Sequence, residues 1–223
     1  MASTRNPDRT RRAILEAATV EFCAAGLAGA RIDAIAVAAG VNKRMLYHYF
    51  GNKDALFAAV LAERLGAPSD APASTSLGER LTAAQRRVAE HPEQTRLLMW
   101  EALAHVGQDV AAAAARTAAW RDPVAANTAA QRAGRLRGDV DAAQLELALA
   151  ALVLFPFAFP QLTQLITGRS PEEGTFLAAH SAFLTSAAKL FEVDVKAAAP
   201  EPAKPRYRLA ATVTETAVQS DRE

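Results

Sequence analysis

The chain has 223 residues, of which 51% are hydrophobic, and its single cysteine, Cys23, excludes an internal disulfide. This size and composition allow one large domain or two small ones around a substantial core. The net charge is only +1, but residues 1–65 carry nine Lys or Arg and six Asp or Glu, and this basic end favours a polyanionic partner. A reduced cysteine and a polar first segment without an apolar core predict a cytoplasmic protein.

Alanine is frequent, and clusters of β-branched or aromatic residues are scarce, so we expect an all-α protein. After a flexible arm at residues 1–8, four short helices are predicted within residues 9–65. Apolar side chains at helical spacing and terminal glycines place the first two helices near 9–25 and 32–39. Asn42 and Asn52 are expected to cap the third and fourth helices.

The second and third helices, joined by a tight turn at Gly40-Val41, have the spacing of a helix-turn-helix. In that motif the first turn of the second helix enters the DNA major groove, where Lys43, Arg44 and Met45 would read base edges. The predicted phosphate contacts come from Asn42, Tyr47, His48 and Lys53. The alternative is an ordinary helix pair with a solvated basic face.

A loop at residues 66–76 is expected to separate these helices from a larger helical domain at residues 77–193. Its helices are predicted at 77–90, 92–106, 108–136 with an interruption at Asp122-Pro123, 141–167 and 171–192. Residues 194–223 show no periodicity, which predicts a disordered tail.

The segment from Leu147 to Gly168 carries no charge over 22 residues, which is long enough to span a bilayer. It contains two prolines and two glutamines, and the sequence has no second segment of this kind. A buried helix at a protein interface explains it better, so no membrane association is expected.

Two apolar features of the larger domain indicate partners. The last predicted helix carries a stripe, and two copies could pair it with the uncharged helix in a four-helix bundle, unless both helices simply pack on their own core. The stripe consists of Phe176, Ala179, Phe183, Ala187 and Leu190. A pocket for a small, largely apolar molecule is the second expectation, with a plain packed core as the alternative. Its candidate lining residues are Met99, Trp100, Leu103, Trp120, Phe155, Phe157 and Phe159, with Glu101 and His105 as polar anchors.

The stretch AIAVAAGVNKRMLYHYFGNKDALF resembles the DNA-binding segment of the tetracycline-repressor (TetR/AcrR) family of bacterial transcriptional regulators. The resemblance covers residues 10–65. It implies an N-terminal three-helix helix-turn-helix DNA-binding domain, followed by a C-terminal helical ligand-binding and dimerisation domain. It further implies a homodimeric repressor that holds a palindromic double-stranded DNA operator and releases it when a small molecule binds, with the fourth helix as a lever. An activator of the same fold is the alternative.

One position departs from the family pattern. Arg31 stands where the family usually has a Thr that caps the second helix and binds a phosphate. Loss of the cap is expected to cost about 1 kcal/mol, and the Arg31 side chain would take over the phosphate contact.

No catalytic residue, metal or cofactor is expected. The chain lacks the GxGxxG, GxxxxGK[ST], HExxH and GxSxG motifs, and its four histidines are dispersed without metal-ligand spacing. A helical enzyme is therefore the weaker alternative. A non-specific nucleoid protein is also weaker, because a net charge of +3 on the basic end is modest.

Overall fold

The computed structural model describes residues 6–65, 76–104, 110 and 113–193. Within these ranges the chain is all-α, apart from an isolated bridge between Leu136 and Glu192, as the composition predicts. The helices described there are α1 (Pro7–Gly29), α2 (Ile32–Ala38), α3 (Lys43–Phe50), α4 (Lys53–Leu65), α5 (Leu77–Glu90), α6 (Pro92–Ala104), α7 (Ala113–Arg132), α8 (Ala142–Ala158), α9 (Pro160–Thr167) and α10 (Gly174–Ala188). The predicted tail at 194–223 and most of the predicted loop at 66–76 lie outside the described residues.

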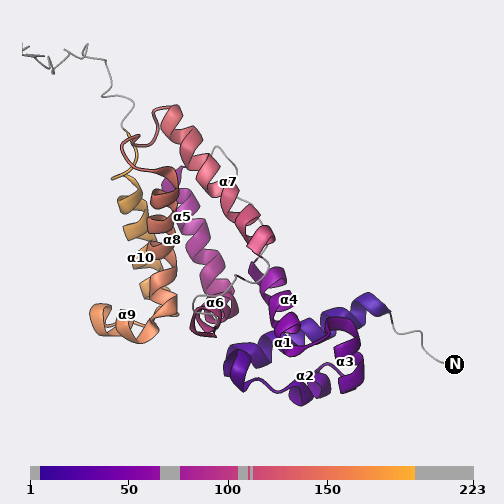
Figure 1. Ribbon diagram of the computed structural model, residues 1–223. Coiled ribbons are helices and arrows are strands. Elements are labelled where there is room, and N and C mark those ends of the chain that lie inside the picture. The colour runs from indigo at the N-terminus through magenta and orange to yellow at the C-terminus, as the bar shows by residue number, and fades with distance from the viewer. Residues whose placement is uncertain (1–5, 66–75, 105–109, 111–112, 194–223) are drawn as a thin grey trace, which may run out of the picture. The chain divides into compact units, whose positions relative to one another are not determined.

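The first four helices share one apolar core. α1 packs against α2 and α4, and α3 packs against both of these shorter helices (Figure 1). The Phe22 and Phe57 rings meet edge to face, with their centroids 4.9 Å apart. Leu97, from α6, is fully buried in the same core, so a helix of the larger domain completes it.

Helix α1 differs from its prediction at its start. It begins at Pro7, which suits a first helical turn, and the Asn6 side chain caps it by accepting a hydrogen bond from the Asp8 N–H. Two residues of the expected arm, Pro7 and Asp8, therefore belong to α1, and residues 1–5 lie outside the described residues. At Gly26 the backbone takes φ 64° and ψ −178°, so the helical geometry breaks where the sequence predicts the end of the first helix, and a short helical segment follows the kink up to Gly29.

The second core lies among α5, α7, α8 and α10. α5 contacts both α8 and α10, and these three helices lie side by side (Figure 1). The largest fully buried side chains of this second core are Leu145, Leu149 and Leu184. The helices are also joined by polar side chains: the buried Asn127 amide accepts from Arg80 at 2.8 Å and donates to Glu146 at 2.9 Å, which links α5, α7 and α8.

Two predictions about helix ends in this domain were wrong. α7 runs through Pro123 without a break, because its packing on α8 offsets the cost of the proline within the helix. The expected single helix at 141–167 is two helices, α8 and α9, bent by 91°. Pro160 disfavours the helical conformation at the preceding residue, and Phe159 accordingly has φ −125° and ψ 64°.

Among the described residues, no single helix is long and apolar enough to cross a membrane. In the described part of the chain, the pair of α8 and α9, bent at their junction, meets the criteria of length and composition together.

Candidate nucleic-acid interface

A tight turn fixes α3 against α2. The Gly40 N–H donates to the Val37 carbonyl and the Val41 N–H to the Ala36 carbonyl, at 3.1 and 3.0 Å. Gly40 has φ 65°, a conformation that favours glycine. Buried Leu46 anchors α3 in the core, so the opposite side of the helix faces outward.

The start of α3 is capped as predicted. The Asn42 side-chain oxygen accepts a hydrogen bond of 2.8 Å from the Met45 N–H. This bond satisfies one of the free N–H groups of the first turn and fixes the direction in which that turn projects. Asn52 caps α4 in the same way, through the Ala55 N–H at 2.7 Å.

The three residues predicted to read bases occupy that first turn. Lys43 and Arg44 are exposed and Met45 is half-buried. The Lys43 ammonium is not isolated: its Nζ lies 3.1 and 3.3 Å from the two carboxylate oxygens of Asp33, on α2. This partner, ten residues earlier in the chain, was not predicted from the sequence.

The residues predicted to contact phosphates are more spread out. Tyr47 and His48 are exposed on α3, and Asn42 is exposed at its start. Lys53 begins α4, and its ammonium donates to the Ala28 carbonyl near the end of α1, at 3.0 Å. Lys53 thus also ties α4 to α1.

Arg31 precedes α2 and provides no side-chain cap, as expected from the missing threonine. The structure shows a compensation that was not predicted: the Glu21 carboxylate, on α1, accepts a hydrogen bond of 2.9 Å from the Arg31 N–H. The Arg31 side chain is exposed at the surface of the domain.

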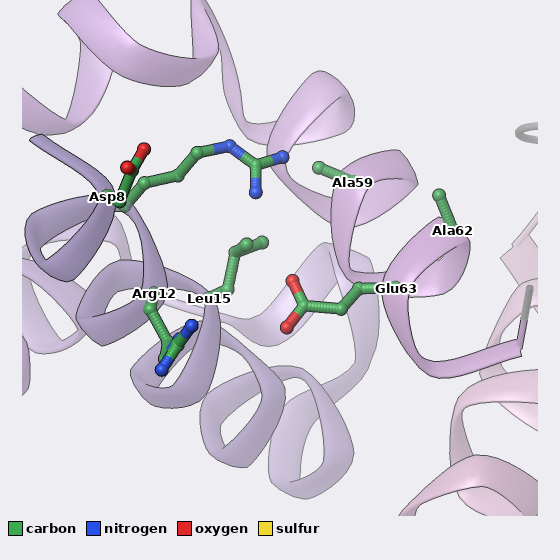
Figure 2. Close-up of a pocket in the computed structure, with 7 residues that line it drawn as sticks. Asp8, Arg12, Leu15, Ala59, Ala62 and Glu63 are labelled. Atoms are coloured by element: carbon green, nitrogen blue, oxygen red, sulfur yellow. The ribbon is translucent and has the colours of Figure 1, made fainter. Parts of the chain in front are cut away.

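An open groove of about 550 Å³ lies between the start of α1 and the second half of α4. Figure 2 shows Asp8 and Arg12 on α1, with Glu63 extending from α4 toward Leu15. Charges of both signs line the groove, which does not suit the largely apolar effector expected from the sequence. Beside it, the Arg11 guanidinium lies over the Phe50 ring, 5.6 Å from its centroid, and supports the end of α3.

Trp100 lies at the contact between α6 and α1. A Cβ added at Gly26 would come within 2.6 Å of its indole ring, so the ring packs directly on the glycine backbone. Its Nε1–H donates to the Cys23 carbonyl at 3.2 Å, near the place where α1 departs from helical geometry. Burial raises the pKa of the Cys23 thiol, which packs in this same contact as a reduced core residue.

The other candidates for the effector pocket are dispersed. Met99 and Phe157 are half-buried, Leu103 and Trp120 are exposed, and Phe155 and Phe159 lie near the bend between α8 and α9. The last two rings contact each other, with centroids 5.1 Å apart. Glu101 forms a partly buried ion pair with Arg116, at 2.6 Å, whereas His105 lies outside the described residues.

The candidates for the dimer interface divide into two groups. Phe176 and Ala187 are buried within the protomer, whereas Phe183 is 51% and Leu190 69% exposed. His180 stacks between Phe176 and Phe183, with ring centroids 5.3 and 5.7 Å away. Burial lowers the pKa of His180, although a hydrogen bond to the Leu152 carbonyl acts in the opposite direction.

The capped, outward-facing α3 and the helical second domain have the architecture of a helix-turn-helix regulator with an appended helical domain. A model of bacterial regulatory proteins of the tetR family matches residues 14–60, and a model of the tetracyclin repressor-like C-terminal domain matches residues 77–189. The chain belongs to the tetR family: it is a DNA-binding transcriptional regulator and not an enzyme.

Relatives with curated names agree with this assignment. The HTH-type transcriptional repressor SCO4008 of Streptomyces coelicolor is 34% identical over 171 residues, which cover 74% of this chain and 88% of the relative. The HTH-type transcriptional repressor NicS of Pseudomonas putida is 32% identical over 162 residues, covering 66% and 76%. Among solved structures, the transcriptional regulator SCO4942 of Streptomyces coelicolor superposes with a TM-score of 0.68 at 25% identity, covering 82% of this chain and 98% of that one.

Proposed function

We propose that the protein is a homodimeric repressor that binds a palindromic operator and leaves it when a small molecule occupies the C-terminal domain. Both curated relatives that match most of the chain are named repressors. As a regulator of bacterial transcription, it would act in the cytoplasm.

One observation carries the DNA-binding part of this proposal: the Asn42 cap and buried Leu46 hold the first turn of α3 outward. That turn presents Lys43 and Arg44 together, and both side chains suit the O6 and N7 acceptors of guanine. Met45 would contact a thymine methyl. Arg31, Asn42, Tyr47, His48 and Lys53 would hold the flanking phosphates.

A second copy of the chain would complete the DNA-binding unit. Two recognition helices reach successive major grooves when they lie about 34–36 Å apart, and a two-fold dimer supplies that spacing. The exposed apolar side chains of the larger domain support this pairing. Leu147 on α8, Phe183 on α10 and Leu190 just after α10 are each at least 51% exposed.

Release of the operator would depend on movement of the helices that join the two cores. α6 contacts α1 through Leu97 and Trp100, and α4 contacts both α6 and α7. An effector that shifts α6 would therefore move α1, with α4 as a second lever, and change the separation of the two α3 helices. We assign Trp100 to the contact between α6 and α1. The remaining candidates for the effector pocket are Met99, Leu103, Trp120, Phe155 and Phe159. A largely apolar effector would suit these side chains.

Selection of bound sequences from random double-stranded DNA, followed by footprinting, tests the proposal. We expect the selected sequences to form a palindrome with guanines in each half-site. Arg44→Ala should bind this palindrome about 10-fold more weakly or worse, because a bidentate base contact contributes about 1–3 kcal/mol. Arg86→Ala is the matched control, because Arg86 is exposed on α5, outside the helix-turn-helix. A wild-type protein that selects no sequence, or binds no DNA at low salt, would refute the proposal.

A further inference from the structure

An ion pair connects the two helices of the helix-turn-helix motif. The Lys43 ammonium lies 3.1 and 3.3 Å from the carboxylate oxygens of Asp33. Both side chains are at least half exposed, at 51% for Lys43 and 65% for Asp33. A carboxylate thus sits beside a residue assigned to base reading, on a surface that has to approach polyanionic DNA.

The fold does not depend on this pair. The contact between α2 and α3 is already secured by buried Ile35 and Leu46 and by the hydrogen bonds of the Gly40 turn. Ion pairs between exposed side chains contribute little to stability. Asp33 does suit the first turn of α2, where a negative charge is favourable, but that preference needs no lysine opposite it.

We propose that Asp33 is a specificity-determining residue, which positions the Lys43 ammonium for a base edge and keeps it from phosphates. The inference rests on the proposed base-reading role of Lys43. The ammonium has three N–H donors, so it can keep its bond to Asp33 and still donate to guanine O6 or N7. A phosphate contact draws Lys43 away and leaves the Asp33 charge unneutralised beside the DNA backbone.

This arrangement penalises binding to non-cognate DNA. Non-specific affinity comes from lysine and arginine contacts to phosphates, and each such contact steepens the dependence of log K on log salt by about 0.9. A Lys43 that is retained by Asp33 contributes no such contact. Specificity therefore increases without any additional bond to the cognate site.

The test compares wild-type protein with Asp33→Asn on the selected operator and on a scrambled duplex of equal length, across a salt series. We expect Asp33→Asn to bind the scrambled duplex more tightly, with a salt slope steeper by about 0.9. The ratio of operator to scrambled affinity should fall by roughly fivefold or more, the lower end of the discrimination of one base contact.

Two further variants make the result specific to this pair. Glu16→Gln changes the charge by the same amount on an exposed part of α1 and should leave the affinity ratio within twofold of the wild-type value. In a Lys43→Gln background, Asp33→Asn should have no further effect on the ratio, because the two residues act as a unit. Circular dichroism of each variant verifies that the helices are intact.

The outcomes separate the inference from the proposed function. A wild-type protein without sequence preference overturns both. A wild-type protein with a clear preference, whose affinity ratio is unchanged in Asp33→Asn, overturns the role of Asp33 alone. A drop in the ratio equal to that of Glu16→Gln also overturns it, because long-range charge then accounts for the effect.

Discussion

Gly26 allows α1 and α6 to approach each other closely. Its φ of 64° with ψ −178° lies in a region that only glycine occupies readily, and the Trp100 ring fills the space where a Cβ would stand. The Trp100 N–H then bonds to the Cys23 carbonyl. One small residue thus permits both the break in α1 and the close packing of the Trp100 indole against it.

Replacement of Gly26 should destabilise the protein more than replacement of another glycine with positive φ. We expect Gly26→Ala to lower the free energy of unfolding by about 3 kcal/mol or more, from backbone strain and steric overlap. Gly134→Ala is the matched control, because Gly134 has φ 67° but no atom within 4 Å of an added Cβ. It should cost about 1–2 kcal/mol in urea denaturation. Equal losses for the two variants would show that the Trp100 contact is not tight.

The residues that sequence predicted correctly are those whose role is local. Asn42 and Asn52 cap helices that start one residue later, and such caps depend on only a few neighbouring residues. Glu21 and Asp33 were missed because their partners lie ten residues away, across a helix packing that no short motif encodes. Trp100 was predicted as a pocket residue from its size alone, and its seat on Gly26 depends on tertiary structure.

At the scale of helices, His180 connects α10 to α8. The Leu152 carbonyl can only accept, so the neutral ring donates from Nε2, and the flanking Phe176 and Phe183 rings keep water away from its faces. This burial lowers the pKa of the imidazole below its ordinary value of 6.5. The folded protein therefore resists protonation of this ring.

A pH dependence of stability follows from that shift. Below about pH 6.5 the unfolded chain binds a proton at His180 that the folded chain does not, so the free energy of unfolding should fall as the pH decreases. His180→Gln retains an N–H donor for Leu152 but does not titrate. Urea denaturation at pH 7.5 and 5.5 should show a smaller loss for this variant than for wild type. The same loss in both would place the pH effect in other groups.

Helix positions followed from the sequence more reliably than helix ends. α5 has the predicted bounds at residues 77–90, because Ser76 and Glu79 form a reciprocal capping box and Pro92 starts the next helix. The last helix was expected at 171–192 but is limited to Gly174–Ala188. The bend at Phe159 was missed because uniform hydrophobicity gave no periodic signal to mark where α8 ends.

At the scale of the whole molecule, two exposed apolar side chains, Phe183 on α10 and Leu190 just after it, predict the oligomeric state. Phe183→Glu and Leu190→Glu each place a charge in the proposed interface, where it would be desolvated without a partner. We expect the double variant to sediment as a monomer and to bind operator at least 10-fold more weakly, because one recognition helix would act alone. Analytical ultracentrifugation and a gel shift measure the two effects.

The control for this prediction lies on the same helix. Ala178 is exposed and points about 140° away from Phe183 around the helix axis, so Ala178→Glu should remain dimeric. A monomeric wild type, or a double variant that still dimerises, would mean that a different surface joins the copies.

The packing of Leu97 and Trp100 against α1 also limits how the protein can be recombined. The two family models meet between residues 60 and 77, which suggests an exchangeable cassette on each side. Yet a hybrid regulator joined between these residues would place the α6 of another protein against this α1, without the Trp100 ring that packs on Gly26. A biosensor that combines this DNA-reading segment with another ligand specificity should therefore carry α6 along with α1, or redesign the two surfaces together.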